Sequence, residues 1–212
     1  MSTTSDGESA ATDPSQTDQT TTVGFGFEAA AERFRVAASA VATDDLDLLT
    51  PCEGWTIRDL LDHAASGPRF FTAIAGGDPS SVTAIDIDTN DVWKGAVADD
   101  LTLLVEAWRD PTAWEGETTV GELTLANAQW ARIGYDELVL HGWDLAATIG
   151  QPYEPGTEEL DVIEPFMEET AAEPAAKGLW GPSFNVEPAF SRFERLLALS
   201  GRDPNWSPRR LA

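Results

Sequence analysis

NAQWARIGYDELVLHGWDLAAT, residues 127–148, is the stretch that decides the fold, because its inward-facing positions recur at every third or fourth residue. That spacing is typical of one face of a helix and predicts the longest helix of the chain. A carboxylate and an imidazole lie one helical turn apart on this face, which otherwise points into the core. The predicted inward face consists of Trp130, Gly134, Glu137, His141, Leu145 and Thr148.

Two helices with a single apolar stripe are predicted upstream of this stretch, over residues 27–41 and 92–109. In each of them apolar side chains recur at alternating intervals of three and four residues. Pro111 ends the later helix, because a proline cannot continue it. The Thr-rich residues 116–124 then predict either a short strand or an extended crossover.

Another helix is predicted to start at Ile57, after a turn that contains Pro and Gly. Thr56 and Asp59 have the spacing of a capping box, in which each side chain binds the backbone of the other residue. Gly67 and Pro68 are expected to interrupt or kink this helix before the apolar pattern resumes.

The C-terminal part, residues 151–212, is predicted to be a short helical extension rather than a second domain. It contains a weak helix over residues 158–169, which we expect Pro165 to break, and a short helix over residues 190–199. Helix content well above the usual third therefore predicts an all-α fold.

Residues 1–22 differ from the rest, since apart from Met1 they are small, polar or acidic. Such a segment cannot bury enough surface to offset its chain entropy, so we expect a disordered, acidic Ser/Thr-rich tail. Residues 23–212 are expected to form a single domain. Neither a signal peptide nor a run of about 18 apolar residues is recognisable, which predicts a cytoplasmic protein with no membrane partner.

Charge is the strongest compositional signal, with 37 acidic and 13 basic residues and a net charge of −24. A chain this acidic repels nucleic acid and anionic membranes, so neither is expected as a partner. The acid excess either keeps the protein soluble or adapts it to a salt-rich cytoplasm, where salt screens the self-repulsion. The scarcity of lysine, with only Lys94 and Lys177, favours the halophilic interpretation.

Candidate metal ligands are limited to His and carboxylate side chains, because Cys52 is the sole cysteine. Glu137 and His141 are pre-oriented by one helix, and His63 is the only other imidazole in the chain. Two His and one Glu with an open position form a pattern that catalytic zinc uses. The alternative is a hydrogen-bonded core His63 and a surface pair between Glu137 and His141.

Two longer motifs carry a resemblance to a known family: TPCxGWTIRDLLxH over residues 50–63 and ELxLHGWDLA over residues 137–146. They resemble the metal-binding proteins related to the N-terminal domain of mycothiol-dependent maleylpyruvate isomerase, in the DinB-like superfamily of four-helix bundles. Residues 196–206 are similar to the ending of an actinobacterial family of such proteins. The resemblance implies a DinB-like four-helix bundle with a short C-terminal helical extension.

The same resemblance implies that His63, Glu137 and His141 are the ligands of a divalent metal ion, foremost zinc, with nickel, manganese and iron as alternatives. It further implies a thiol-dependent S-transferase or isomerase-like enzyme, whose partners are a small-molecule thiol and an electrophilic substrate. Maleylpyruvate isomerisation itself is not expected, because the large second domain of that isomerase has no counterpart in these residues. The alternatives are a non-catalytic metal-binding protein, acting as sensor, store or partner-binding module, and a purely structural bundle.

Three further polar residues lie within or beside these motifs. Cys52 is expected to be a small structural residue in its turn, and Asp59 to act as the helix cap. Asp144 either accepts a hydrogen bond from the ligand imidazole of His141 or binds backbone or Arg58, and both remain open.

Aromatic and basic residues near the motifs are also assigned structural roles. Trp55 and Trp143 are expected in the core rather than as substrate platforms. Arg58 and Arg132 are expected to be solvated or salt-bridged rather than to hold an anionic substrate.

Overall fold

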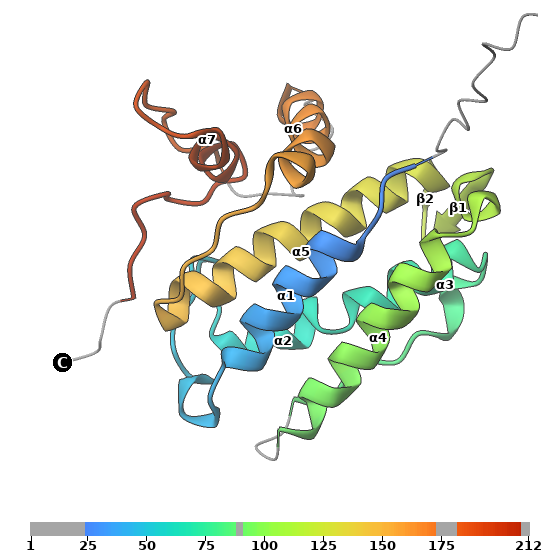
Figure 1. Ribbon diagram of the computed structural model, residues 1–212, viewed down its shortest axis with the longest axis horizontal. Helices are drawn as coiled ribbons and strands as arrows, with labels where there is room; N and C mark the ends of the chain where they lie inside the picture. The colour runs from blue at the N-terminus through green and yellow to red at the C-terminus, as the bar shows by residue number, and fades with distance from the viewer. Residues whose placement is uncertain (1–23, 88–90, 173–181, 209–212) are drawn as a thin grey trace, which may run out of the picture.

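Residues 24–87, 91–172 and 182–208 are described by the computed structural model of the protein, and they are mostly helical (Figure 1). The disordered tail predicted for residues 1–22 lies outside these described residues. None of the helices within them combines the length and apolar character needed to cross a membrane.

The centre of the fold is a four-helix bundle, as the sequence predicts. Helix α1 packs against α4 and α5, and α3 packs against the same two helices. Helices α2 and α3 together occupy one of the four helix positions of the bundle. Pro68 lies in the first turn of α3, which begins only a few residues after α2 ends. The bounds are Glu28–Ala40 for α1, Ile57–Ala64 for α2, Gly67–Ala75 for α3, Val92–Trp108 for α4 and Asn127–Ile149 for α5.

The start of α2 confirms the predicted capping box. The Thr56 hydroxyl accepts a hydrogen bond from the Asp59 amide at 3.3 Å, and the Asp59 carboxylate accepts one from the Thr56 amide at 2.8 Å. These contacts satisfy backbone donors that have no partner in the first turn of a helix. The cap thereby fixes where α2 begins, two turns before His63.

A small hairpin precedes α5, so the strand is confirmed as the correct one of the two alternatives predicted for the Thr-rich segment. Strands β1 (Glu117–Val120) and β2 (Leu123–Ala126) pair antiparallel, and Gly121 in their turn has a positive φ of 60°. The Trp130 indole donates a hydrogen bond to the Thr118 carbonyl at 2.9 Å, which ties the hairpin to the first turn of α5.

Helix α5 lies in the middle of the protein and needs glycine at two places where another side chain touches its backbone. A Cβ built on Gly134 would lie 2.7 Å from the Phe71 ring, and one on Gly142 would lie 2.5 Å from the Tyr153 hydroxyl. Both distances are shorter than real carbon contacts allow, so α3 and the segment after α5 can approach only where α5 lacks a side chain.

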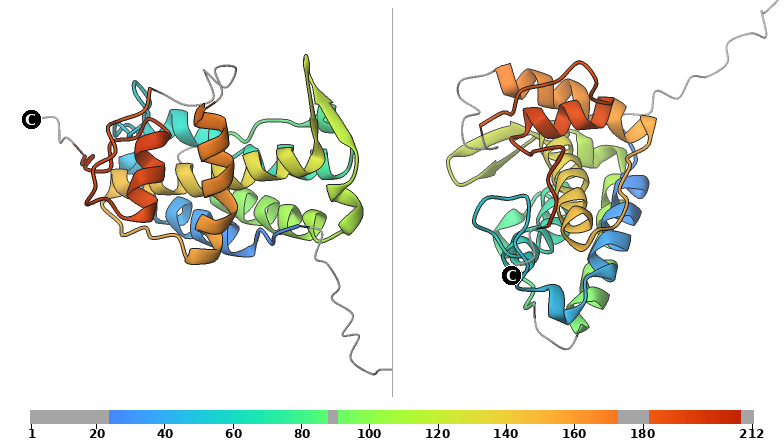
Figure 2. Two further views of the ribbon diagram at one scale, coloured as in Figure 1. Left: turned by 90° about the horizontal axis from the view of Figure 1, so that it is seen from above. Right: turned by 90° about the vertical axis from the view of Figure 1, so that its left-hand side faces the viewer.

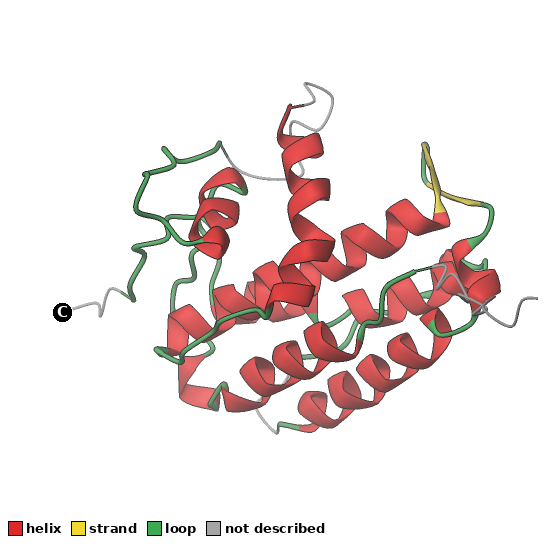
Figure 3. Ribbon diagram, turned by 45° about the horizontal axis from the view of Figure 1, so that its top comes forward, coloured by secondary structure: helices red, strands yellow, loops and turns green. Residues whose placement is uncertain are grey.

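The C-terminal extension lies against one side of α5 (Figure 2). Helix α6 (Thr157–Ala172) packs on α5, and α7 (Arg192–Leu199) packs on α6. Figure 3 shows α6 crossing over α5 rather than continuing the bundle. The Arg33 guanidinium of α1 binds the buried Glu159 carboxylate through two contacts of 2.7 and 3.0 Å, which fastens α6 to the bundle.

The prediction that Pro165 breaks the helix in this region is wrong, because α6 runs through it. A proline inside a helix removes one backbone hydrogen bond and normally costs about 3 kcal/mol. Tertiary contacts offset that cost here: Met167 is fully buried one half-turn later, and Arg192 of α7 binds both Asp161 and Glu164 beside the proline. The packing of α6 between α5 and α7 therefore overrides its local sequence.

The close contact at Gly134 gives a stability test. Gly134→Ala is expected to lower the free energy of unfolding by about 1–3 kcal/mol, because the new methyl group would overlap the buried Phe71 ring. Gly95→Ala is the matched control, since Gly95 lies inside α4 with open space around it, and this change is expected to stabilise by about 0.5–1 kcal/mol. Urea unfolding measures both, and equal effects of the two changes would contradict the packing argument.

Candidate metal centre

The three predicted ligand residues come together at the contact between α2 and α5. Glu137 and His141 project from successive turns of α5, and His63 reaches them from α2. Both imidazole Nε2 atoms lie 3.1 Å from the same Glu137 oxygen, Oε2. The two rings are nearly perpendicular, with centroids 5.1 Å apart. Three possible ligand atoms therefore converge on one point.

The centre is closed on the α5 side and open on the α2 side. The His141 side chain is 10% exposed and Glu137 35%, whereas His63 is 48% exposed. The Trp55 ring stands edge-on against His63, with centroids 5.3 Å apart. Among the residues that the structure describes, no further His, Cys, Asp or Glu joins this group. A small molecule could therefore approach the centre past His63.

The second nitrogen of His141 faces a buried carboxylate. His141 Nδ1 lies 2.8 Å from Asp144 Oδ2, and the Asp144 side chain has no exposure to solvent. An ionised carboxylate only accepts hydrogen bonds, so we assign the ring proton to Nδ1. The Nε2 lone pair then points to Glu137, which is the arrangement in which a carboxylate orients a ligand histidine.

This arrangement favours a positive charge between His141 and Glu137. A lone pair on Nε2 and an acceptor oxygen at 3.1 Å repel each other unless a proton or a metal ion lies between them. Burial lowers the pKa of His141, yet hydrogen bonds with Asp144, Cys52 and Glu137 raise it well above 6.5. Burial likewise raises the pKa of Glu137, but hydrogen bonds from His141 and His63 lower it overall.

The donor set fits a divalent metal ion. Two imidazole nitrogens and one carboxylate oxygen, brought from two helices, are ligands that zinc and similar metals accept. A divalent ion bound by these groups would supply the positive charge described above without a second proton on the His141 ring.

Arg202 completes the surroundings of His141, a role that the sequence does not predict. Its guanidinium binds Asp144 through Nε to Oδ1 at 2.8 Å and Nη2 to Oδ2 at 2.7 Å, and the residue is almost fully buried after the end of α7. Burial raises the pKa of Asp144, but the charge of Arg202 and the bond from His141 bring it down to about 2. Asp144 is therefore ionised and paired.

Of the two roles left open for Asp144, the structure supports the contact with the His141 imidazole. The suggested partner Arg58 is wrong, because its guanidinium donates to the Ile87 carbonyl instead. Arg202 lies within the C-terminal stretch 196–206 that resembles family sequences, but no spacing in the sequence links it to Asp144.

Cys52 occupies the turn before α2 and is partly buried. Its thiol donates a hydrogen bond to Asp144 Oδ2 at 3.2 Å and the residue packs against the core, as expected of a structural cysteine. Asp144 therefore accepts hydrogen bonds from three side chains that come from three separate segments.

The remaining residues keep the structural roles assigned from the sequence, with one difference. Asp59 is an exposed cap, Trp143 is buried in the core, and Arg132 is exposed to solvent. Trp55 is only partly buried, because its ring lies between the core and the open side of the centre, beside His63.

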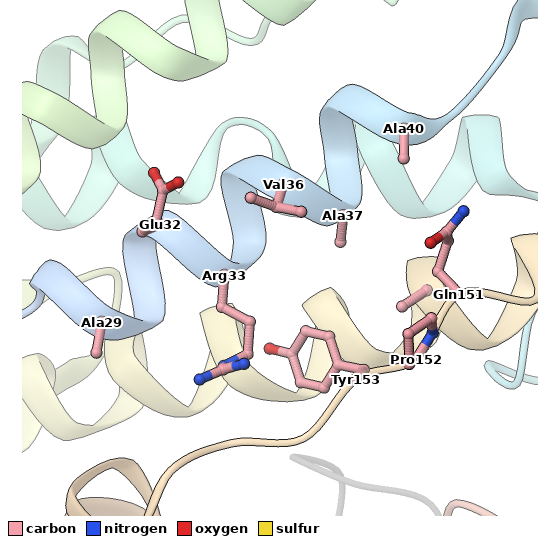
Figure 4. Close-up of a pocket in the computed structure, with 10 residues that line it drawn as sticks. Ala29, Glu32, Arg33, Val36, Ala37, Ala40, Gln151, Pro152 and Tyr153 are labelled. Atoms are coloured by element: carbon pink, nitrogen blue, oxygen red, sulfur yellow. The ribbon is translucent and has the colours of Figure 1, made fainter.

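A separate groove of about 360 Å³ lies between α1 and residues 151–153 (Figure 4). Four of its ten lining residues are alanines, and the Arg33 guanidinium lies 5.7 Å from the Tyr153 ring centroid. None of the three candidate ligands lines it. The groove is therefore not part of the candidate metal centre.

Comparison with known proteins connects this arrangement to one family. A family model described as "Mycothiol maleylpyruvate isomerase N-terminal domain" matches residues 27–146, more than half of the chain. These residues extend from the start of α1 into the last turns of α5 and include all three candidate ligands. None of the curated proteins compared with the chain matches it.

A solved structure described as "Crystal structure of the mycothiol-dependent maleylpyruvate isomerase" shares the fold, with a TM-score of 0.51 and 17% sequence identity. The alignment covers 68% of this chain and 66% of that protein, so the chain spans just under two thirds of its length. The likeness confirms the predicted helical-bundle fold.

Proposed function

The chain belongs to the family of the mycothiol maleylpyruvate isomerase N-terminal domain, and on that premise we propose that it binds one divalent metal ion through His63, Glu137 and His141. The observation that carries the proposal is the approach of both imidazole Nε2 atoms to one Glu137 oxygen at 3.1 Å. Zinc is the first candidate for this donor set, and nickel, manganese or iron would also be accepted.

The open side of the centre favours catalysis over a structural role. A structural zinc site is closed by four protein ligands, whereas a catalytic site keeps a position free. Here the described residues supply three ligands, and the most exposed of them, His63, faces solvent. This supports an enzyme rather than a metal used only for stability.

We propose that the reaction is thiol-dependent S-transfer or isomerisation, with a small-molecule thiol and an electrophile as substrates. Mycothiol is the thiol named for the solved relative. A bound divalent metal would lower the pKa of a coordinated thiol, so that the thiolate is present near neutral pH.

The residues of this chain prepare the centre for that chemistry. Asp144 holds the His141 ring and its Nδ1 proton, and Arg202 keeps Asp144 ionised. The Trp55 ring lies against His63 at the open side, where an incoming substrate would contact it. Buried partners of this kind fix a ligand ring within the narrow range of orientations that catalysis requires.

The alternative is a metal-binding protein without catalysis, acting as a sensor, store or partner-binding module. It would use the same three ligands, so metal binding alone does not separate the two. Reaction with a thiol does separate them, because only the enzyme requires an exchangeable position at the centre.

The acidic composition supports a further part of the proposal, namely function in a salt-rich cytoplasm. A net charge of −24 destabilises a compact chain by self-repulsion unless salt screens it. The cytoplasmic location and the absence of nucleic-acid partners stay predictions from the sequence.

Metal binding is tested by elemental analysis of protein purified without a metal-affinity tag. Wild-type protein is expected to contain close to one equivalent of a divalent metal. His141→Ala is expected to bind it at least about a hundredfold more weakly, because losing a ligand exceeds the roughly 10–100-fold loss seen when only a ligand's hydrogen-bond partner is changed. Asp62→Asn is the matched control, since Asp62 neighbours His63 but is outside the group, and it should retain the metal. Equal metal in wild type and His141→Ala would refute the site.

Thiol binding is tested with cobalt-loaded protein. Adding a small thiol is expected to produce cobalt–thiolate absorption in the wild type and in Asp62→Asn, where the thiol takes the exchangeable position on the bound ion. His141→Ala is expected to show no such absorption, because it no longer holds the ion. Transfer assays with a series of electrophiles then identify the reaction. A protein that binds cobalt but shows neither the absorption nor transfer would support the non-catalytic alternative.

Salt dependence is tested by urea unfolding in increasing KCl. Raising the ionic strength from about 0.1 M to about 1 M shortens the screening length from about 10 Å to about 3 Å. Because this weakens the repulsion between the acidic side chains, the urea concentration at the unfolding midpoint is expected to rise. Sucrose serves as the control, because it strengthens burial without screening charge. A midpoint that responds to sucrose but not to KCl would count against the halophilic interpretation.

A further inference from the structure

A second group of potential metal ligands lies directly behind His141. Cys52 Sγ, His141 Nδ1 and Asp144 Oδ2 lie within 4.8 Å of one another, close enough to surround one ion. They offer a sulfur, a nitrogen and an oxygen, a set that zinc and other transition metals bind. His141 belongs to both groups and would present one ring nitrogen to each.

The Arg202 guanidinium fills the position that such an ion would take. Its Nη2 lies 2.7 Å from Asp144 Oδ2, 3.4 Å from His141 Nδ1 and 4.0 Å from Cys52 Sγ. One guanidinium nitrogen therefore faces all three potential ligand atoms. The side chains of Asp144 and Arg202 are 0% and 8% exposed, so water does not compete for this contact.

We propose that Arg202 acts as an internal cation that excludes a second metal ion and restricts the centre to one. This inference rests on the proposed function, because it takes His63, Glu137 and His141 as the ligands of the first ion. It assigns to Arg202 a positioning role, acting through Asp144 and His141 rather than by contact with a substrate.

The consequence for the centre is a fixed state of the His141 ring. With Arg202 in place, Nδ1 keeps its proton and donates a hydrogen bond to Asp144, which leaves only Nε2 as a ligand. Without the guanidinium, the ring would be open to bridging two ions through both nitrogens. The Cys52 sulfur would then become a metal ligand, releasing its proton to solvent.

A simpler interpretation is that Arg202 only neutralises the buried Asp144 carboxylate. Both interpretations explain the salt bridge, but only the proposed exclusion predicts that loss of the arginine charge creates a new metal position that includes sulfur. The number of bound ions and the presence of a metal–sulfur bond are therefore the quantities that decide between them.

The experiment titrates tag-free protein with Co²⁺, followed by removal of unbound metal, elemental analysis and near-ultraviolet absorption. Wild type is expected to bind one equivalent without cobalt–thiolate absorption. Arg202→Gln, which retains hydrogen-bond donors for Asp144 but loses the charge, is expected to double the bound cobalt and to show that absorption. The double variant Arg202→Gln, Cys52→Ser is expected to return to one equivalent and to lose the absorption.

Arg192→Gln is the matched control, because Arg192 lies on α7 and binds Asp161 and Glu164 away from the centre. It is expected to bind one equivalent without cobalt–thiolate absorption, like the wild type. Should Arg202→Gln be unfolded as purified, cobalt present during refolding is expected to restore its circular dichroism with two equivalents bound. The same treatment should fail when Cys52→Ser is added.

The outcomes separate this inference from the proposed function. No cobalt in folded wild-type protein would overturn the proposed function. One equivalent in both wild type and Arg202→Gln, or failure of cobalt to restore an unfolded Arg202→Gln, would overturn the inference alone. Two equivalents with cobalt–thiolate absorption in the wild type would also overturn it, since the guanidinium would then not exclude the second ion.

Discussion

The Asp144 carboxylate, enclosed in the middle of the protein, is the constraint on which the candidate centre depends. An unpaired charge at such a position costs several kcal/mol, so the fold must bring it donors. Three segments do so: Arg202 follows α7, His141 lies one turn earlier on α5, and Cys52 lies in the turn before α2. Pairing with Arg202 leaves a carboxylate that orients the imidazole without adding net charge to the core.

This interaction makes the C-terminal extension part of the centre rather than an addition to the bundle. The chain after α7 must lie against α5 for Arg202 to reach Asp144, and α6 is held by the pair between Arg33 and Glu159. The family model covers only residues 27–146, so these two contacts join the extension to the matched region. The cation that pairs with Asp144, the carboxylate that orients His141, thus comes from outside that region.

Three of the scarce positive charges of this acidic chain bind buried carboxylates. Arg33, Arg69 and Arg202 each bind a carboxylate that the fold has buried, namely Glu159, Asp100 and Asp144. Exposed carboxylates remain largely in solvent, where salt screens them. The arginines therefore stabilise specific contacts between segments, while the overall charge depends on the surrounding solution.

The sequence by itself determined most of the helices, the capped start of α2, a short strand as one of two options for the Thr-rich segment, and the placement of Glu137 and His141 on one face. These features depend on neighbours a few residues apart. The family motifs extended this to His63, whose approach to α5 the bundle confirms, while metal binding stays a prediction. Only the tertiary structure decided that α6 runs through Pro165 and that Arg202, rather than Arg58, pairs with Asp144. Both depend on contacts between segments far apart in the chain, which leave no periodic pattern in the sequence.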